Sequence, residues 1–591
     1  MSITAHVMGP QTRTRDVLSH ERSAAALRRT VPPDQLHPSF TEPWLDRPVS
    51  ILVAVAGVTE QAQARLWAEL AAVPRVHRDY PPAVAPRDDV EPDAVPVGSA
   101  DVEAPVAAAV NVCFEVKLSG PSNGNPFVDV ELTADFVSST VGTRRVGGFY
   151  DGDGAYLIRF LPPASGAWEM TTHSTARSLD QVRLSFDAEP SSERGPVRVV
   201  DDTHFAYANG EPYVPIGTTA YAWTHQDDTL QEQTLATLAA APFTKLRMCI
   251  FPKHYLYNDD DPRCFPFEAV EGGFDHTRFN PAFFHHLEHR LRQLRQLGIE
   301  ADLILFHPYD RWGFMDLGPT VDERYVRYVV RRLAAFTNVW WSLANEYDLI
   351  WTKDLDDWER IAAVVKEEDH ADHLTSIHNG LYLYDYSADW ATHCSIQKVD
   401  PERVADIVSD WRRTWGKPVV FDEPGYEGDL EYDWGNLTAQ EMTRRFWEAT
   451  VRGAYMTHGE TYWSADNRIF WSRGGRFVGE SVERIAFLAQ IIADSPTHRL
   501  DPITTGLLGT SGGARSRYEV HYFGPLQPRS KTVPVPAGTH AHIDVIDTWA
   551  MTITTLPGLH HGDVTVPLPT KPYMAVRVRV LPSSDLPHGT A

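Results

Sequence analysis

Short apolar stretches recur between residues 213 and 457, and helical patterns lie between most of them. Apolar runs of this kind, without polar alternation, are typical of parallel strands that are buried on both faces. The predicted strands are 213–217, 244–251, 301–306, 339–344, 374–377, 392–396, 418–421 and 454–457. Helical periodicity is found between them at 281–297, 323–336, 355–368 and 438–452.

Eight strands joined by helices over roughly 290 residues match the count and size of a (β/α)8 TIM barrel. A doubly wound open sheet would give the same alternation. Such a sheet often carries a glycine-rich nucleotide-binding turn after its first strand, and none follows 213–217. The pattern therefore favours the barrel, and the predicted fold class is α/β.

The pattern changes on either side of the barrel. Residues 127–136, 155–161, 518–523 and 575–580 alternate with period two, which predicts short strands of antiparallel β-sandwiches. Residues 16–30 and 59–73 have helical composition, and 80–105 is rich in proline. The predicted domains are a helical N-terminal extension with its linker (1–105), a β-sandwich (106–195), the barrel (196–498) and a C-terminal β-sandwich (499–591).

Composition limits the partners of the chain. Asp and Glu total 79 against 54 Lys and Arg, a formal net charge of −25. An acidic surface repels phosphate backbones and anionic lipid, so neither nucleic acid nor a membrane is an expected partner. The four cysteines include no CxxC pair, and no leader or membrane span is apparent. We therefore expect a cytoplasmic protein without a disulfide framework, whose helical N-terminus is available for contact in a homo-oligomer.

Two glutamates stand at the carboxyl ends of predicted strands, where TIM barrels carry their catalytic residues. Glu346 follows 339–344, and Glu423 follows 418–421. Glycoside hydrolysis needs one carboxylic acid to protonate the leaving oxygen and a second carboxylate to attack the sugar or activate water. The pair predicts a glycoside hydrolase that acts on a small oligosaccharide or glycoside. The alternatives are that each Glu is a structural ion-pair partner, and that the chain is a non-catalytic carbohydrate-binding protein.

The Asn345-Glu346 pair together with Glu423 resembles the signature of the retaining clan A glycoside hydrolases. The resemblance implies that Glu346 is the general acid/base and Glu423 the nucleophile of a double displacement. It implies that Arg247 holds Glu423 ionised and that Asn345 binds the sugar 2-hydroxyl. Other positions of the clan are matched by His307 after the third strand, Trp463 after the eighth and His393 near the sixth.

A narrower resemblance covers residues 110–591. The segments that carry it are Gly120-Pro-Ser-Asn-Gly-Asn125, Gly148-Phe-Tyr-Asp-Gly152, Pro215-Ile-Gly-Thr-Thr-Ala-Tyr-Ala-Trp223, Glu423-Pro-Gly-Tyr-Glu427 and His458-Gly-Glu-Thr-Tyr-Trp463. They are similar to the apiosidase-like barrels and their bacterial relatives. The resemblance implies this architecture and leaves the sugar open.

Further residues near the predicted mouth are candidates for sugar contacts. Glu427 is also the alternative nucleophile, although the predicted strand 418–421 ends nearer Glu423. Candidates for bonds to hydroxyls are His378, Asn379, Glu427, His458, Glu460 and Asp466, and candidates for stacking are Trp223, Tyr309, Trp312 and Trp463.

One motif indicates different chemistry. His285-His-Leu-Glu288-His289 has the spacing of a zinc peptidase helix, which would make the chain a metallopeptidase. It falls on the predicted helix 281–297, which lies outside the mouth of a barrel, and no third ligand is evident. We therefore expect neither a metal nor a cofactor.

Overall fold

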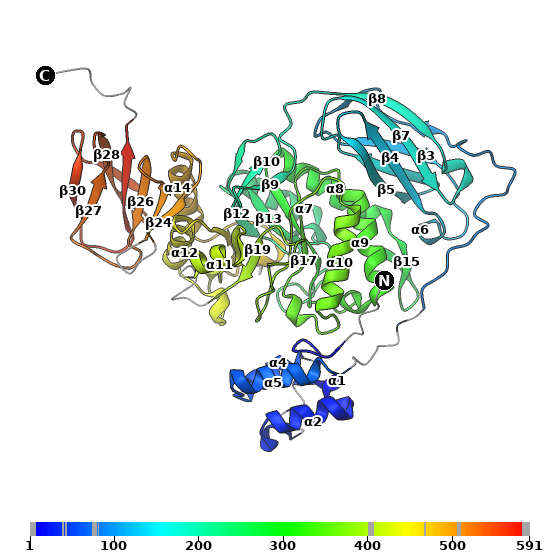
Figure 1. Cartoon of the computed structure of the whole chain (residues 1–591), viewed down its shortest axis with the longest axis horizontal. Helices are drawn as coiled ribbons and strands as arrows, with labels where there is room; N and C mark the ends of the chain where they lie inside the picture. Colours follow the sequence, from blue (N-terminus) through cyan, green and yellow to red (C-terminus); the bar gives the residue numbers. More distant parts are fainter. Residues whose placement is uncertain are drawn as a thin grey trace.

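The computed structural model describes residues 7–37, 41, 44, 45, 47–73, 80, 82–399, 407–465, 468–504 and 510–581. Four parts follow one another along the chain: a helical unit, a β-sandwich, a central barrel and a C-terminal β-domain (Figure 1). The barrel occupies the centre of Figure 1, with the helical unit below it and a β-domain on either side.

Eight parallel strands form the barrel. They are β12 (Ile216–Thr219), β13 (Lys245–Cys249), β16 (Glu300–Phe306), β17 (Val339–Ala344), β18 (Thr375–Ser376), β19 (Cys394–Gln397), β20 (Val419–Glu423) and β22 (Tyr455–His458). Each strand pairs with its neighbour in the sequence, and β22 pairs with β12. A parallel bridge from His378 to Ser395 closes the ring between β18 and β19. The predicted α/β fold, a TIM barrel with flanking β-domains, is confirmed.

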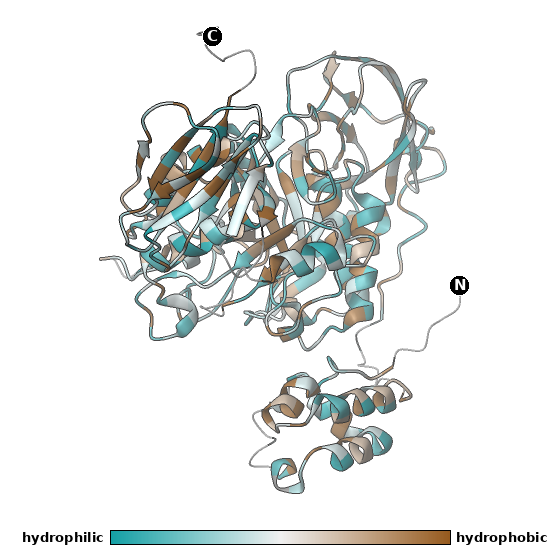
Figure 2. Ribbon diagram, turned by 60° about the vertical axis from the view of Figure 1, so that its left-hand side comes forward, coloured by the Kyte–Doolittle hydropathy of each residue, from teal (hydrophilic) through white to brown (hydrophobic). Residues whose placement is uncertain are grey.

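Amphipathic helices surround the strands, and the strands themselves are mostly hydrophobic (Figure 2). The helices are α7 (Asp228–Ala239), α8 (Pro281–Gln296), α9 (Pro319–Leu333), α10 (Leu355–Glu368), α11 (Val408–Trp415), α12 (Ala439–Val451) and α14 (Ser481–Ala493). Helix α9 buries Tyr325, Val326, Val329, Val330 and Leu333, a spacing that places them on one face of the helix. This face covers the barrel wall and so keeps water from the strands.

The other end of the barrel is closed by a small sheet of β9 (Val197–Val200), β10 (His204–Tyr207) and β11 (Pro212–Tyr213). The Phe205 ring lies 5.2 Å from that of Trp340 and 5.3 Å from that of Tyr455, between ring centroids. Because Trp340 and Tyr455 are near the starts of their strands, this aromatic cluster closes the amino ends. Access to the interior is therefore from the carboxyl ends.

The N-terminal β-sandwich consists of β1 (Val102–Glu103), β2 (Ala108–Ala109), β3 (Phe114–Ser119), β4 (Leu132–Ser138), β5 (Gly142–Gly152), β6 (Ala155–Phe160), β7 (Gly166–Ser174) and β8 (Arg183–Glu189). A buried ionic network joins it to the barrel. Arg159 on β6 donates to both Glu288 oxygens, at 2.7 and 2.9 Å, and Arg332 on α9 donates to Glu288 at 2.8 Å. His285 bonds Asp151 on β5 at 2.9 Å. The zinc-peptidase-like motif is thus used to join two domains.

The C-terminal β-domain packs against α12. Its strands are β24 (Asp501–Thr504), β25 (Thr510–Ala514), β26 (Tyr518–Tyr522), β27 (Ser530–Val535), β28 (Ala541–Asp547), β29 (Thr552–Thr555), β30 (Gly562–Pro567) and β31 (Met574–Val580). Six of them form one antiparallel sheet, and β27 pairs with β30 in a second. The Trp447 and Tyr522 rings stack across the boundary at 5.4 Å.

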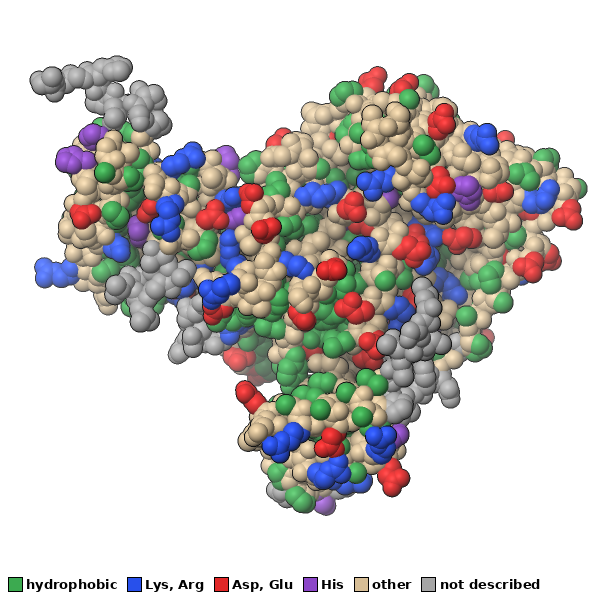
Figure 3. Space-filling view, viewed as in Figure 1, with side chains coloured by type: hydrophobic (Ala, Val, Ile, Leu, Met, Phe, Trp, Pro, Cys, Tyr) green, Lys and Arg blue, Asp and Glu red, His purple; other side chains and the backbone are tan. Residues whose placement is uncertain are grey.

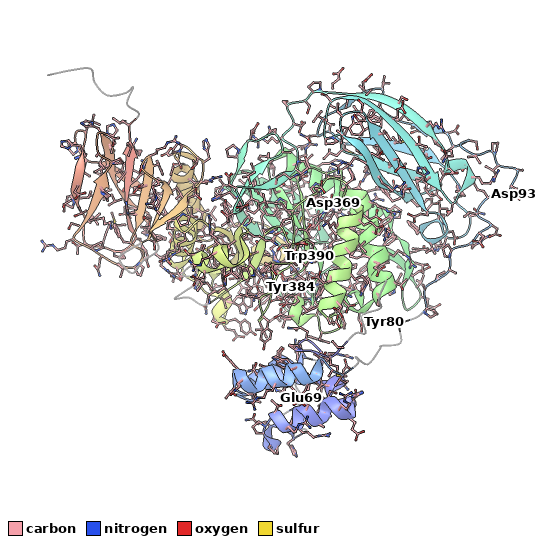
Figure 4. The ribbon with its side chains drawn as sticks, viewed as in Figure 1. Glu69, Tyr80, Asp93, Asp369, Tyr384 and Trp390 are labelled. Atoms are coloured by element: carbon pink, nitrogen blue, oxygen red, sulfur yellow. The ribbon has the colours of Figure 1, made fainter. Side chains whose placement is uncertain are left out.

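The helical unit comprises α1 (Thr14–Ser19), α2 (Glu21–Thr30), α4 (Val49–Val55) and α5 (Glu60–Leu70), which share a small core of their own. It meets the barrel on the side where the strands end. The Arg47 guanidinium lies 4.6 Å from the Trp351 ring centroid, on the loop after β17. Tyr384 and Trp390, on the loop after β18, are on this side of the barrel in Figure 4, and Tyr80 lies on the connection from the helical unit.

The surface in Figure 3 carries acidic and basic side chains intermixed, with hydrophobic side chains gathered where the helical unit meets the barrel. Within the described ranges, no helix is both long and apolar enough to cross a membrane. The homo-oligomer stays a prediction.

Candidate active site

Glu346 and Glu423 are buried at the carboxyl ends of β17 and β20, each with 6% of its surface exposed. Glu346 has a left-handed backbone, with φ of 50°. This conformation costs a non-glycine residue about 1 kcal/mol or more and is common at functional sites. The strained turn follows β17 directly and places the Glu346 carboxylate at the mouth of the barrel.

An irregularity in β20 brings Glu423 to the same place. Ile396 pairs with Phe421, but the next residue of β19, Gln397, pairs with Glu423. Asp422 is therefore an extra residue, as in a β-bulge, and such bulges re-aim side chains near active sites. As a result, two consecutive carboxylates reach the inside of the barrel.

Each glutamate accepts a hydrogen bond from its own tyrosine. The Tyr309 hydroxyl donates to Glu346 Oε2 at 2.5 Å, and the Tyr221 hydroxyl donates to Glu423 Oε1. Both tyrosines are on loops that follow barrel strands, β16 and β12. Neither phenol competes for the oxygens that face the other glutamate, so the two carboxylates remain available to a common substrate.

Gln397, the last residue of β19, lies between the two glutamates. With its amide oriented to satisfy both of its polar atoms, the Gln397 nitrogen is 3.2 Å from Glu346 Oε1 and 3.2 Å from Glu423 Oε2. These two oxygens are therefore no further apart than twice 3.2 Å. Asn379 fixes the Gln397 backbone, because its Oδ1 accepts the Gln397 N–H at 3.0 Å and its Nδ2 donates to the Gln397 carbonyl at 3.2 Å.

Arg247 and Asn345 orient the pair. The Arg247 Nη1 donates to Asn345 Oδ1 at 3.1 Å and is 3.7 Å from Glu423 Oε1. Because Asn345 Oδ1 is occupied in this way, its Nδ2 faces the other direction and donates to Glu346 Oε2 at 3.1 Å. His378 Nδ1 is 3.9 Å from Glu423 Oε1.

A buried ionic cluster supports the pair from below. The Lys245 ammonium donates to Asp302 at 2.7 Å and to Asp422 at 2.6 Å. Burial alone would raise the Asp422 pKa, but the charges of Lys245 and Arg247 hold that pKa well below its usual range. Asp422 is therefore a permanent anion next to Glu423 in the chain.

The pKa values of both glutamates are raised. Burial, followed by the charge of Glu346, raises the pKa of Glu423 to about 7, with Arg247 acting in the opposite direction. Burial also raises the pKa of Glu346, against the donation from Tyr309. Two carboxylates this close do not both ionise readily, so the pair retains one proton close to neutral pH.

Several residues predicted to contact sugar have other roles. Glu427, on β21 (Glu427–Gly428), accepts from the backbone N–H groups of residues 480 and 481 at 2.9 and 3.2 Å. Glu460, on β23 (Glu460–Thr461), accepts from those of residues 478 and 479 at 2.5 and 2.9 Å. Both glutamates are almost fully buried and anchor the start of α14. These contacts also argue against Glu427 as the nucleophile.

Two predicted histidines, His393 and His458, are likewise not at the mouth, and a third, His307, lies at the carboxyl end of β16 with both ring nitrogens already bonded. His393 precedes β19 and packs 5.2 Å from the Trp340 ring, at the closed end of the barrel. His458 bonds the Thr218 hydroxyl at 3.1 Å and stacks on Phe243, outside the strands. His307 uses its two ring nitrogens on the Phe251 carbonyl, at 3.1 Å, and the Tyr309 N–H, at 3.3 Å.

The aromatic candidates divide in the same way. Trp223 is fully buried, and its indole N–H points to the Met248 sulfur at 3.3 Å, so it is a core residue. Trp463 is 44% exposed, with its ring 5.7 Å from that of Tyr257. Tyr309 lies beside the pair, where its hydroxyl donates to Glu346, and the half-buried Trp312 donates its indole N–H to Asp261 at 3.0 Å. Asp466 lies outside the described residues.

Sequence reasoning missed Tyr221, Gln397 and Lys253, all within or beside the pair. The signal for Gln397 was its position at the end of β19, two residues beyond Ser395 on the same face. Tyr221 and Lys253 follow β12 and β13 by two and four residues, where loop geometry decides which side chain turns inward. No spacing rule applies there.

Comparisons with known proteins agree with this geometry. Residues 200–472 match the model of a family described as apiosidase-like, catalytic domain, and residues 111–175 and 509–579 match two domains of unknown function. A structure from Bacteroides vulgatus ATCC 8482, assigned to the glycoside hydrolases, is 38% identical with a TM-score of 0.76, and the match covers 81% of this chain and 100% of that one.

Two further structures share the fold at low identity. A glycoside hydrolase of family 5, also from Bacteroides vulgatus ATCC 8482, is 13% identical with a TM-score of 0.53, over 66% of this chain and 94% of that one. Another glycoside hydrolase is 14% identical with the same TM-score, over 66% and 98%. No protein with a curated description matches.

A TIM barrel with paired carboxylates at its mouth, flanked by these β-domains, defines a glycoside hydrolase. The chain belongs to the glycoside hydrolases, and its barrel is similar to the apiosidase-like catalytic domain over residues 200–472.

Proposed function

We propose that the protein hydrolyses a glycosidic bond of a small oligosaccharide or glycoside with retention of configuration. The observation that supports this is the spacing of Glu346 and Glu423, whose nearest oxygens share the Gln397 amide at 3.2 Å each. Retaining enzymes place their carboxyl groups about 5–5.5 Å apart, and inverting enzymes about 6.5–9.5 Å, to leave room for water. A separation of at most twice 3.2 Å favours the retaining class.

The charge distribution supports one assignment of the two roles. Arg247 faces Glu423 and not Glu346, so the negative charge of the pair is better stabilised on Glu423. Glu423 is then the nucleophile, and Glu346 holds the shared proton as the acid. Glu346 is the carboxyl group bonded by Asn345 and Tyr309, which fix the direction of its proton toward the leaving oxygen.

The reaction proceeds in two displacements. A Glu423 oxygen attacks the anomeric carbon, the bond to the leaving oxygen breaks, and the Glu346 proton passes to that oxygen. The resulting glycosyl ester is attacked by water while Glu346 takes a proton from it, which restores both carboxyl groups.

The test is hydrolysis of a panel of aryl pyranosides and furanosides of both anomers, followed by substitution. Glu423→Ala should abolish turnover of the active glycoside, and azide should partly restore it as a glycosyl azide, because a small anion fits the space vacated by the carboxylate. Glu346→Gln should lose activity most on substrates with poor leaving groups. Glu431→Gln, which replaces an exposed loop glutamate, is the control and should keep wild-type activity.

Two outcomes would overturn the proposal. Full activity of Glu423→Ala would show that Glu423 is not the nucleophile. A first-formed product of inverted configuration, detected by NMR, would exclude the double displacement. Binding of sugars without turnover by the intact protein would favour the carbohydrate-binding alternative.

A further inference from the structure

Lys253 lies beside the catalytic pair, on the loop after β13, with 1% of its surface exposed. Its ammonium faces four aromatic rings. The distances from Nζ to the ring centroids are 3.5 Å for Tyr221, 4.2 Å for Tyr309, 4.7 Å for Tyr255 and 5.1 Å for Trp471 of α13 (Phe470–Arg473).

This lysine differs from its neighbour Lys245, whose ammonium bonds two carboxylates. Among the described residues, no carboxylate oxygen lies within 4.0 Å of the Lys253 ammonium. A buried charge without an ion-pair partner is costly, and aromatic faces recover only part of that cost. Burial accordingly lowers the Lys253 pKa. The cost of keeping a cation here calls for a function in the site.

The two nearest rings are those that serve the catalytic pair. Tyr221 donates to Glu423, and Tyr309 donates to Glu346. A positive charge on the face of a phenol draws electron density from its oxygen, which makes the hydroxyl a stronger hydrogen-bond donor. Lys253 is therefore coupled to both carboxylates, through one phenol each.

We propose that Lys253 is a positioning residue that stabilises the ionised form of whichever catalytic glutamate carries the charge, acting through Tyr221 and Tyr309. The proposal rests on the function proposed above. In the first displacement the charge is on Glu423. Once Glu423 is esterified, the charge is on Glu346, which then acts as the base, and the same ammonium faces both phenols throughout.

The charges around the site fit this role. Lys245, Arg247 and Lys253 supply three positive charges, and Asp302 and Asp422 supply two negative ones. These five groups carry a net charge of +1, which favours one negative charge on the glutamate pair, whereas burial and the charge of Asp348 act in the opposite direction by raising the pKa of Glu346. The other groups that face Lys253 are the Cys249 thiol and the His307 and His378 rings. Burial raises the pKa of Cys249 to about 12 and lowers the pKa of both histidines, so these three groups are neutral.

The test is the pH profile of kcat/KM for Lys253→Met and Lys253→Arg, with Lys531→Met on the C-terminal domain as a matched control. Loss of a positive charge raises carboxyl pKa values, so both limbs for Lys253→Met should move to higher pH by about one unit. Lys253→Arg, which keeps the charge, should restore much of the wild-type profile.

A second measurement tests the route through the phenols. The shift caused by Lys253→Met should be smaller in a Tyr221→Phe, Tyr309→Phe background, where no hydroxyl transmits it. Infrared difference spectroscopy against pH follows the carboxylic acid band of the pair, which is assigned with Glu423→Gln. The pH midpoint of this band should move to higher pH in Lys253→Met, as the limbs do, and this measurement needs no turnover.

These readouts separate the two proposals. If the band and the limbs of Lys253→Met do not move, the proposal is wrong even where Glu423 proves to be the nucleophile. If KM alone rises, Lys253 contacts the substrate directly, which also overturns it. If Glu423→Ala remains active, the proposed function fails, and the infrared band still decides whether Lys253 sets the charge of the pair.

Discussion

Replacement of Glu300 by Gln should stabilise the protein at alkaline pH and leave it nearly unchanged at acid pH. Glu300 begins β16 at the closed end of the barrel and is 3% exposed. Its Oε2 accepts from the Trp340 indole N–H at 3.2 Å, and within the described residues no cation lies within 4.0 Å of it. Burial raises its pKa to about 8, against the hydrogen bond from Trp340.

The sign follows from proton linkage. The folded pKa is above the unfolded one, so the folded state binds more protons between about pH 4.3 and 8, and stability is lost as pH rises through this window. At 1.36 kcal/mol per pKa unit, the loss above pH 8 amounts to roughly 3–5 kcal/mol. Gln cannot ionise, and its amide oxygen can still accept from Trp340.

Thermal unfolding at pH 5, 7 and 9 provides the measurement. The melting temperature of Glu300→Gln should match the wild type at pH 5 and exceed it by roughly 5 °C or more at pH 9. Glu271→Gln, an exposed substitution, should show no pH-dependent difference. A gap between Glu300→Gln and wild type that is the same at all three pH values would refute the reasoning.

Two further predictions concern the domain junction and the acid. Glu288→Gln leaves Arg159 and Arg332 without their buried carboxylate and should lower the free energy of unfolding, measured with denaturant, by about 3–5 kcal/mol. Glu103→Gln, in an exposed ion pair, should lower it by under about 1 kcal/mol, and equal losses in the two variants would contradict this prediction. Tyr309→Phe removes a donor to the charged form of Glu346, so the basic limb of kcat/KM should rise by about one pH unit, and an unmoved limb would show that the hydroxyl does not tune the acid.

The strands of the barrel could be predicted from the sequence because they are buried on both faces. Every predicted barrel strand overlaps an observed one. Glu346 and Glu423 could be predicted with them, because Glu423 ends β20 and Glu346 is two residues beyond the end of β17. The small sheet of β9 to β11 was not foreseen. Its strands are short, and their burial depends on rings from the distant Trp340 and Tyr455, which no local pattern reveals.

Most of the wrong site predictions arose because the alternation of side chains along a strand was not applied. Side chains along a strand point to opposite faces in turn, so Thr457 and His458 cannot both face the barrel interior. Thr457 does so, because its hydroxyl donates to Asp422 at 2.8 Å, and His458 therefore points outward.

The same rule applied to β19 would have found the missing residue of the pair. His393, Ser395 and Gln397 share a face, and the Ser395 hydroxyl donates to Asp422 inside the barrel at 2.6 Å. Of the three, Gln397 is the one at the carboxyl end, where the mouth is, whereas His393 is at the closed end. His393 was proposed there because of the resemblance to clan A, but position along the strand decides which side chain can reach a substrate.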